Sequence, residues 1–398
     1  MLKSVNLVIV SSALHYKEGD SLFAYGPYVR EIDLWAELFA SVIIAAPCRV
    51  GPPPGDCLPF SSKRICIHPI SETGGDTIGA KLKQIAMLPK LVVELCSVMH
   101  RADAIHVRCP GNLGLLGVVL APLFSNRRIA KYAGEWGGYP REPWTIVLQR
   151  LLLRSRWWGA PVTVYGSHPN QPAHVVPFFT SVLDDSQVAK GRRAAKCRAP
   201  LVGTHLHVLF VGRLASSRNV DVLIQAVADL IDEGVALECT IVGDGPLGPD
   251  LRRLAAAGSA ADHVHFVGAI PHDCVLRYYE NADVLVLASE TEGWGKSLVE
   301  AMAFGLVCIG SNRGPVPEML GGGRGLIVPP GDVSALAEHL RNIAYNPPEF
   351  MRMRAAAAHW GQRFTLSGLR DALRDLLESQ WDPTKSLKIP TGDRRVSA

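Results

Sequence analysis

Cysteine pairs of the kind that define a fold or a zinc site are lacking in this sequence. The nine cysteines are odd in number, are scattered over 398 residues and include no C-x-x-C pair. Such pairs mark disulfide-rich secreted domains and structural zinc sites. Their absence argues against both classes of protein and favours a reducing, cytoplasmic compartment.

Long hydrophobic runs are also lacking. The longest, residues 113–124, falls short of the ~18 apolar residues that cross a membrane and is interrupted by Gly117 and Pro122. The apolar core of residues 3–14 is too short for a signal peptide, and we expect a first β-strand there. We therefore expect a cytoplasmic protein whose contact with the inner membrane surface, if it has one, is peripheral.

Charge of one sign is in only slight excess, because 41 lysines and arginines face 37 aspartates and glutamates, a formal net charge of +4. This excess allows an anionic ligand but does not indicate a nucleic-acid partner. Aspartate, glutamate and histidine nowhere recur with the spacing of metal ligands. We therefore expect no metal site and no bound cofactor.

What the chain does contain is two series of short apolar strands that alternate with helices. A chain of 398 residues with 48% hydrophobic residues is too long for one core and favours two domains. The alternation predicts an α/β fold in which parallel sheets are covered on both faces. We expect a first domain at residues 1–180, with strands at 5–10, 42–46, 65–68, 104–107, 129–132 and 162–165 and a polar loop at 11–26. We expect a second domain at residues 206–350, with strands at 208–211, 238–242, 264–267, 284–288, 307–310 and 325–328.

The alternation stops between residues 181 and 205, where a run of lysines and arginines predicts a solvated linker. A helical stretch is expected at residues 351–380, followed by a flexible tail at 381–398. Ligands of open α/β sheets bind beyond the carboxyl ends of the strands. We therefore expect the functional site in a cleft between the two domains, on loops that leave the strands.

The loop within residues 289–302 joins a predicted strand to a predicted helix. The first amides of a helix have no internal partner, and its macrodipole is positive there, so the junction suits a phosphate. Gly293 and Gly295 allow a ligand to approach the backbone closely, and Lys296 adds a positive charge. The sequence therefore predicts an anion site at this junction.

Two carboxylates, Glu292 and Glu300, flank this junction with seven residues between them. Ser297 and Glu300 also have the spacing of a capping box, which by itself would explain Glu300. The capping box does not explain Glu292 or the two glycines.

Two further loops of the second domain carry weaker signals. Arg213 and Arg218 follow its first strand, and guanidinium groups match the oxygens of a diphosphate; exposed arginines at a helix start are an equally good interpretation. Residues 243–248 match G-x-G-x-x-G, but this motif follows the second strand and Pro246 lacks a backbone donor. We interpret it as a tight turn and discount a nicotinamide or flavin oxidoreductase.

The first domain offers one loop and one helix of interest. Glu135 and Trp136 lie among glycines, where a carboxylate beside an aromatic ring suits a sugar; a turn with a packed tryptophan is the alternative. The helix at 144–158 has an apolar strip on each of two sides, and Arg150 and Arg156 lie near the second strip. Burial on both sides is the interpretation we favour, and a membrane-surface helix is the alternative.

Residues 206–345 resemble the retaining glycosyltransferases of family 4, whose GT-B fold has two Rossmann-like domains facing a central cleft. The resemblance is carried by Phe-Val-Gly-Arg-Leu at 210–214, by Ile-Val-Gly-Asp-Gly-Pro at 241–246 and by Gly-Leu-Ile-Val-Pro-Pro-Gly-Asp at 325–332. Its most specific part is the Glu-x7-Glu motif from Glu292 to Glu300, followed by Ala-Met-Ala. Over residues 1–180 only the architecture is similar.

The resemblance implies that a sugar passes from a nucleotide-diphosphate sugar to a glycan, lipid-linked or small-molecule acceptor, with retention and without a metal, in polysaccharide or glycoconjugate synthesis. Arg213 and Arg218 would hold the diphosphate, and Glu292 would touch the sugar. Family members usually have lysine and glycine where this chain has Arg218 and Asn219. Glu135 is our candidate for orienting the acceptor. The donor-binding positions that the resemblance implies are Gly212, Ile270, Gly293, Gly295, Lys296, Ser297 and Glu300.

The resemblance also implies that the helical stretch at 351–380 returns to the first domain. Two other functions remain open at this stage. One is a GT-B phosphorylase, which takes free phosphate in the same cleft. The other is a protein that binds a nucleotide-sugar without turning it over, which the departures at Arg218 and Asn219 would allow.

Overall fold

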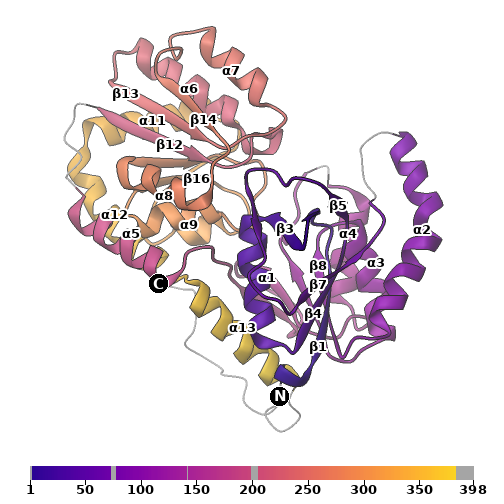
Figure 1. Ribbon diagram of the computed structural model, residues 1–398. Helices are drawn as coiled ribbons and strands as arrows, with labels where there is room; N and C mark the ends of the chain where they lie inside the picture. The colour runs from indigo at the N-terminus through magenta and orange to yellow at the C-terminus, as the bar shows by residue number, and fades with distance from the viewer. Residues whose placement is uncertain (1, 73–77, 141, 199–204, 382–398) are drawn as a thin grey trace. The chain divides into compact units, whose positions relative to one another are not determined.

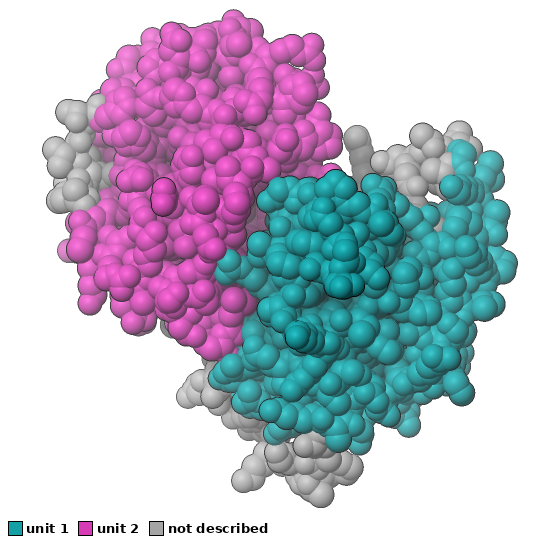
Figure 2. Space-filling view, viewed as in Figure 1, with its two compact units in different colours: residues 1–179, 369–397 teal, residues 180–368, 398 magenta. Residues whose placement is uncertain are grey.

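A computed structural model of the protein describes residues 2–72, 78–140, 142–198 and 205–381. The chain forms two compact units, which Figure 2 distinguishes by colour. Unit 1 comprises the described residues up to Phe179 and from Leu369, and unit 2 comprises Thr180–Gly368. The tail expected from residue 382 onward lies outside the described residues.

Unit 1 is built on a seven-stranded sheet in the order β11-β10-β9-β8-β1-β4-β7, and every paired strand is parallel. Neighbouring residues of a strand point to opposite faces, so Val8 and Val10 join a core with α2, α3 and α4 while the residues between them face away from it. In Figure 1, α1 and α3 lie on opposite sides of this sheet. The strands are β1 (Asn6–Val10), β4 (Ser41–Ala46), β7 (Ile65–Pro69), β8 (Ala104–Cys109), β9 (Arg128–Tyr132), β10 (Val162–Tyr165) and β11 (Val175–Phe178), and the helices are α1 (Gly26–Leu38), α2 (Ile78–Met99), α3 (Asn112–Leu120) and α4 (Trp144–Arg154).

The polar loop expected at residues 11–26 is wrong, because those residues contain part of a second, small sheet. Strands β2 (His15–Glu18) and β3 (Ser21–Tyr25) form an antiparallel hairpin, flanked by β5 (Cys48–Val50) and β6 (Cys57–Pro59). The hairpin turns at Gly19, whose φ of 59° suits glycine. These strands are short and carry polar residues at their turn, so they do not show the apolar runs from which strands were predicted.

Unit 2 contains a six-stranded parallel sheet in the order β14-β13-β12-β15-β16-β17. Helices α6, α7 and α11 pack together, while α8, α9 and α12 contact the sheet through β12, β15 and β16. All six predicted strands are present. They are β12 (Leu206–Val211), β13 (Leu237–Val242), β14 (Val264–Gly268), β15 (Val284–Leu287), β16 (Val307–Ser311) and β17 (Leu326–Val328), and the helices are α6 (Val220–Asp232), α7 (Gly248–Ala256), α8 (His272–Asn281), α9 (Lys296–Ala303), α10 (Val316–Leu320), α11 (Val333–Tyr345) and α12 (Pro347–Gly361).

The expected irregular linker at 181–205 contains a regular helix, α5 (Asp185–Cys197), which belongs to unit 2. Asp184 begins this helix with a capping box that it shares with Gln187, a local signal that the basic composition obscured. The basic run is not simply solvated either. Arg198 donates hydrogen bonds to the carbonyls of Tyr279 and Phe304, at the C-terminal ends of α8 and α9, where helix carbonyls lack internal partners.

The helical stretch expected at 351–380 is two helices, α12 and α13 (Leu366–Trp381). The helix breaks at residues 362–365, and Thr365 accepts a hydrogen bond from the amide of Gly368 in the first turn of α13. From Leu369 onward α13 belongs to unit 1, where the ring of Trp381 contacts that of Phe39.

Candidate functional site

The sequence-predicted donor residues of unit 2 lie on loops that leave the carboxyl ends of β12, β14 and β15. Strands β12 and β15 are neighbours in the sheet, with Leu209 paired to Leu285. Because the strands are parallel, these loops emerge at the same edge of the sheet. The topology therefore gathers residues that are up to 88 positions apart in the chain, from Gly212 to Glu300.

The loop after β12 is held in place by the glycine-rich turn at residues 243–248. The amide of Leu214 donates to the carbonyl of Asp244, and the amide of Gly212 donates to that of Val242, both at 3.0 Å. A Cβ at Gly243 would lie 1.9 Å from the carbonyl oxygen of Gly212, and a Cβ at Gly245 would lie 2.4 Å from that of Leu214. These contacts explain the glycines as packing positions and agree with the interpretation of this motif as a tight turn.

Arg213 and Arg218 follow β12 but differ in their surroundings. The side chain of Arg213 is exposed and has no polar partner within the described part of the chain. Arg218 ends the short 3-10 helix Ser216–Arg218 and pairs with Glu292. Its Nη1 also donates to the Ser289 hydroxyl at 3.2 Å.

Glu292 is buried and its backbone is tightly packed. A Cβ at Gly314, which has a φ of +53°, would lie 2.1 Å from the Glu292 carbonyl oxygen. Asn219 adopts the left-handed conformation at φ 48° and donates from Nδ2 to the Ala288 carbonyl at 2.9 Å. The Arg218–Glu292 pair is therefore fixed from both loops, and Asn219 supplies the backbone conformation for which glycine is usual.

The junction at residues 293–297 has the expected form. Helix α9 begins at Lys296, and Gly295 occupies the N-cap position without a side-chain cap. The predicted capping box between Ser297 and Glu300 is not formed, so the first amides of α9 have no side-chain partner from this source. Lys296 and Glu300 border one small cavity, which Trp294 also lines.

Glu300 instead contacts His272, whose Nε2 lies 3.2 Å from the Glu300 carboxylate. His272 is the first residue of α8 and follows the loop that contains Ile270, after β14. Its Nδ1 is buried and has no partner within the described residues. Sequence reasoning missed His272, although its position two residues beyond Ile270 and at a helix start was a signal.

The sugar-stacking interpretation of Glu135 and Trp136 is not supported for the tryptophan. Trp136 is 1% exposed, and the centroid of its ring lies 5.0 Å from that of Tyr132. The Arg154 guanidinium lies over the Trp136 ring. Glu135 is half-buried on the same loop after β9. The alternative, a turn with a packed tryptophan, describes this loop.

Sequence reasoning also missed a buried charge cluster at the carboxyl ends of β8 and β9 in unit 1. Glu31 of α1 accepts from Arg108 at 2.6 Å and from Lys131 at 2.7 Å. Burial alone would lower the pKa of Arg108, but the attraction of Glu31 and its hydrogen bond raise that pKa above its ordinary value. Burial lowers the pKa of His106 well below its ordinary value and that of His15 to about 4, so both imidazoles are neutral at pH 7.

Helix α4 is not buried on both sides, so the interpretation favoured from the sequence is wrong. One face carries Trp144, Val147, Leu148 and Leu151, with Trp144 73% exposed and Leu151 56% exposed. The opposite face is buried and includes polar side chains, among them Arg150, which pairs with Glu142. Arg150 thus lies on the inside and Trp144 on the outside, which the composition of the helix does not reveal.

No group of three or more His, Cys, Asp or Glu side chains among the described residues could hold a metal ion. None of the described helices combines the length and apolar character that crossing a bilayer requires. That the site works without a metal or cofactor stays a prediction.

Comparison with known sequences places the site in a recognised region. Residues 196–360 match the family described as Glycosyl transferases group 1. The D-inositol 3-phosphate glycosyltransferase of Streptomyces bingchenggensis is 32% identical over 210 residues, which are 50% of this chain and 46% of that protein. The amylovoran biosynthesis glycosyltransferase AmsK of Erwinia amylovora is 33% identical over 159 residues, 38% of this chain and 39% of that protein. The chain thus spans less than half the length of these relatives.

Solved structures resemble the chain over nearly its whole length. The sucrose-phosphate synthase of Thermosynechococcus elongatus has a TM-score of 0.70 at 21% identity and covers 95% of this chain and 99% of its own. The Anabaena protein HepE, in complex with UDP and glucose, has a TM-score of 0.66 at 16% identity and covers 94% and 100%. At these identities the likeness concerns the fold, and together with the two parallel sheets it confirms the expected α/β fold of the GT-B type.

Proposed function

We propose that this protein is a glycosyltransferase that takes a sugar from a nucleotide-diphosphate sugar. The observation that carries the proposal is the meeting of Arg218 with Glu292 and of His272 with Glu300 at one edge of the unit 2 sheet. These contacts lie in the region that matches Glycosyl transferases group 1. Donor-site roles for Arg218, Glu292 and Glu300 were expected from the resemblance, and the geometry is compatible with them; His272 is added by its contact with Glu300.

The chemistry needs positive groups where the leaving nucleoside diphosphate develops negative charge. Arg213 is exposed and unpaired within the described residues, so its guanidinium is available to a diphosphate. Lys296 and the amides at the start of α9 lie at the same sheet edge. Charges and dipoles that are already in position stabilise the developing charge without reorganisation, so these groups would act in place of a metal.

The two carboxylates have different tasks in this proposal. Glu292 holds Arg218 through one oxygen, Oε2, and its other oxygen would accept a hydroxyl of the donor sugar. Glu300 would bind the ribose hydroxyls, with His272 orienting its carboxylate. Gly212, Gly293, Gly295 and Ser297 would present backbone groups to the donor, and Ile270 would face the base.

We further propose retention of the anomeric configuration and an acceptor that is a glycan, a lipid-linked glycan or a small molecule. Retention rests on the Glu-x7-Glu motif, and the acceptor on the printed names of relatives such as the D-inositol 3-phosphate and amylovoran enzymes. Glu135 would orient the acceptor. A cleft shared by the two units stays a prediction.

The test is a panel of nucleotide-sugars, each assayed for thermal stabilisation and for release of nucleoside diphosphate. The true donor should raise the melting temperature by mass action and should be hydrolysed slowly without an acceptor. The same sugar 1-phosphate without the nucleotide serves as the control. Formation of sugar phosphate from a glycan and free phosphate would instead identify a phosphorylase, and binding without any turnover would identify a nucleotide-sugar-binding protein.

We also propose that unit 1 contacts a membrane surface through α4. Trp144, Val147, Leu148 and Leu151 form an exposed stripe with helical spacing, and Arg156 lies just beyond the end of the helix. Amphipathic helices of this composition lie at the boundary between headgroups and acyl chains. The protein would then work in the cytoplasm at the surface of the inner membrane.

Sedimentation with vesicles that contain anionic lipid tests this contact. The pair of substitutions Trp144→Ser and Leu151→Ser should remove most of the binding and leave the melting temperature nearly unchanged, because both side chains are exposed. Val50→Ser is the matched control, since Val50 is also an exposed apolar residue of unit 1. Equal binding of all three proteins would contradict the proposal.

A further inference from the structure

A second cavity lies in unit 1, at the opposite edge of its sheet from the loops described above. Its volume is about 660 Å³, within the range of small-molecule sites. The residues around it precede strands: Leu2 and Lys3 lie before β1, Leu38 before β4, and Ser62 and Arg64 before β7. Helix α13 closes one side. The cavity is therefore separate from the carboxyl ends of the strands of unit 1, where the loop with Glu135 follows β9.

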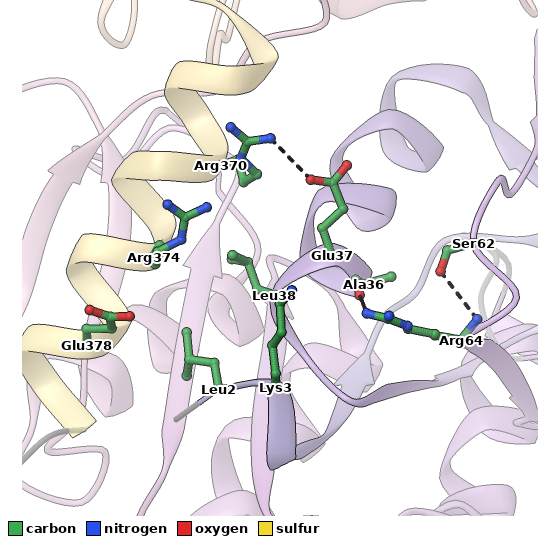
Figure 3. Close-up of a pocket in the computed structure, with 10 residues that line it drawn as sticks. All are labelled: Leu2, Lys3, Ala36, Glu37, Leu38, Ser62, Arg64, Arg370, Arg374 and Glu378. Carbon is green, nitrogen blue, oxygen red and sulfur yellow. Dashed lines mark hydrogen bonds and ion pairs between the residues drawn. The ribbon is translucent and has the colours of Figure 1, made fainter.

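Basic side chains predominate in this cavity. Arg370, Arg374 and Glu378 occur at intervals of four residues, so they share one face of α13. Figure 3 shows Arg370 and Arg374 extending from α13 on one side of the end of α1 and Arg64 lying on the other. With Lys3 the lining contains four cationic residues against two carboxylates, Glu37 and Glu378.

The arginines are positioned by weak contacts that leave most of their donors unused. Arg64 Nη1 lies 3.5 Å from the carbonyls of Ala36 and Phe39, at the C-terminal end of α1. Arg370 pairs with Asp371 at 3.2 Å and with Glu37 at 3.4 Å, and Arg374 pairs with Asp371 at 3.3 Å. The partners Glu37 and Asp371 are each 53% exposed, and exposed pairs of this kind stabilise a fold little.

We propose that this cavity binds a small soluble molecule that carries two or more phosphoryl groups. The guanidinium fork matches phosphoryl oxygens, and arginines on two sides of the cavity would each take one group. A single phosphate is too small to reach both sides of a cavity of about 660 Å³. Because α13 supplies two of the arginines, the bound molecule would fasten this helix to α1 and to the loop before β7.

Isothermal titration calorimetry of the full chain with inorganic pyrophosphate tests the proposal. The parent protein carries Arg213→Ala, which reduces the contribution of the proposed donor site to the signal. Arg374→Ala should weaken pyrophosphate binding roughly 10-fold or more, as expected for loss of a charge-assisted hydrogen bond. Arg101→Ala is the matched control, because Arg101 is an exposed arginine of unit 1 outside the cavity, and it should change the affinity less than twofold.

Arg64 contacts the end of α1, and complete removal of its side chain would disturb this packing. Arg64→Lys keeps the positive charge, removes the guanidinium fork and should also weaken pyrophosphate binding. Orthophosphate should bind more weakly than pyrophosphate. Equal pyrophosphate affinity in the parent, Arg374→Ala and Arg64→Lys proteins would place the binding elsewhere and overturn the proposal. Absence of binding at millimolar pyrophosphate in the parent would also overturn it. Neither result would bear on nucleotide-sugar turnover, which is measured with Arg213 present.

Discussion

Glu31 in unit 1 and Glu292 in unit 2 are both buried carboxylates that bond to an arginine, but their surroundings differ. Glu31 lies on a helix, and its partners Arg108 and Lys131 lie on strands, with side chains 15% and 8% exposed. Glu292 lies on a loop, and its partner Arg218 is 31% exposed. The first cluster is largely shielded from solvent, whereas the second presents a cation to solvent.

This difference separates a charge that holds a domain together from a charge that is available for chemistry. Glu31 ties α1 to the neighbouring strands β8 and β9. Glu292 sits beside glycines and a helix start, where a diphosphate can approach the backbone. Substitution of Glu31 should therefore lower the stability of the protein, whereas substitution of Glu292 should lower its turnover.

The largest effect is expected from Glu31→Gln. It leaves two buried cations without their anion, which should lower the free energy of unfolding by about 3–5 kcal/mol. Glu37→Gln is the control, because Glu37 lies on the same helix and forms an exposed pair that contributes about 1 kcal/mol or less. Denaturant melts of both variants measure the difference. Equal stability of the two would show that the Glu31 cluster does not hold unit 1 together.

His15 should make the protein sensitive to acid. Its pKa is lowered by burial from 6.5 to about 4 in the folded state, so the folded protein binds fewer protons than the unfolded chain. Stability from this group is present above pH 6.5 and is lost as the pH falls toward 4, by an amount on the order of 3 kcal/mol.

His15→Asn tests this prediction, because the amide does not titrate and can keep the hydrogen bond to the Ala13 carbonyl. The wild-type protein should lose more stability than the variant between pH 6.5 and pH 4. Parallel pH profiles of the two proteins would assign the acid sensitivity to other groups.

Arg213→Ala and Glu292→Ala should each reduce turnover roughly 100-fold or more, as loss of one transition-state donor does. Their melting temperatures should change little compared with that of Glu31→Gln. Steady-state release of nucleoside diphosphate measures the effect. Wild-type rates in both variants would remove these residues from the donor site.

The smallest effect is expected from Asn219→Gly. Glycine accepts the left-handed conformation without strain, so the change removes only the hydrogen bond to the Ala288 carbonyl, worth about 1 kcal/mol. Turnover should fall less than in the Glu292 variant. A loss as large as that of Glu292→Ala would mean that Asn219 itself serves the donor site.

The Glu292 loop could be predicted from the sequence, and the Glu31 cluster could not. Glu292, Arg213 and Arg218 could be selected because they lie on loops after apolar strands, and the glycines marked the junction. The pairing of Arg218 with Glu292 could not be predicted, because it depends on β12 and β15 being neighbours in the sheet. Glu31 gave no signal, since it is one charge within a helix and its partners lie 77 and 100 residues away. His272 was missed because its position at a helix start, two residues beyond Ile270, is a weak signal. Its bond to Glu300, which marks it more strongly, depends on the fold.

Strands were predicted well where they are apolar and central, and poorly where they are short and polar. The six strands of unit 2 matched their expected ranges, whereas β2 and β3 were taken for a loop. The buried face of helix α4 was also predicted incorrectly, because Arg150 points inward to Glu142 and Trp144 points outward. Pairing and exposure of this kind depend on partners that lie elsewhere in the chain.

Amide hydrogen exchange with and without the nucleoside diphosphate of the true donor shows which loops the donor contacts. We expect slower exchange at residues 212–218 and 293–299 in unit 2, with the amides around Glu31 unchanged. Slower exchange confined to unit 1, or no protection at residues 293–299 under saturating ligand, would contradict this expectation.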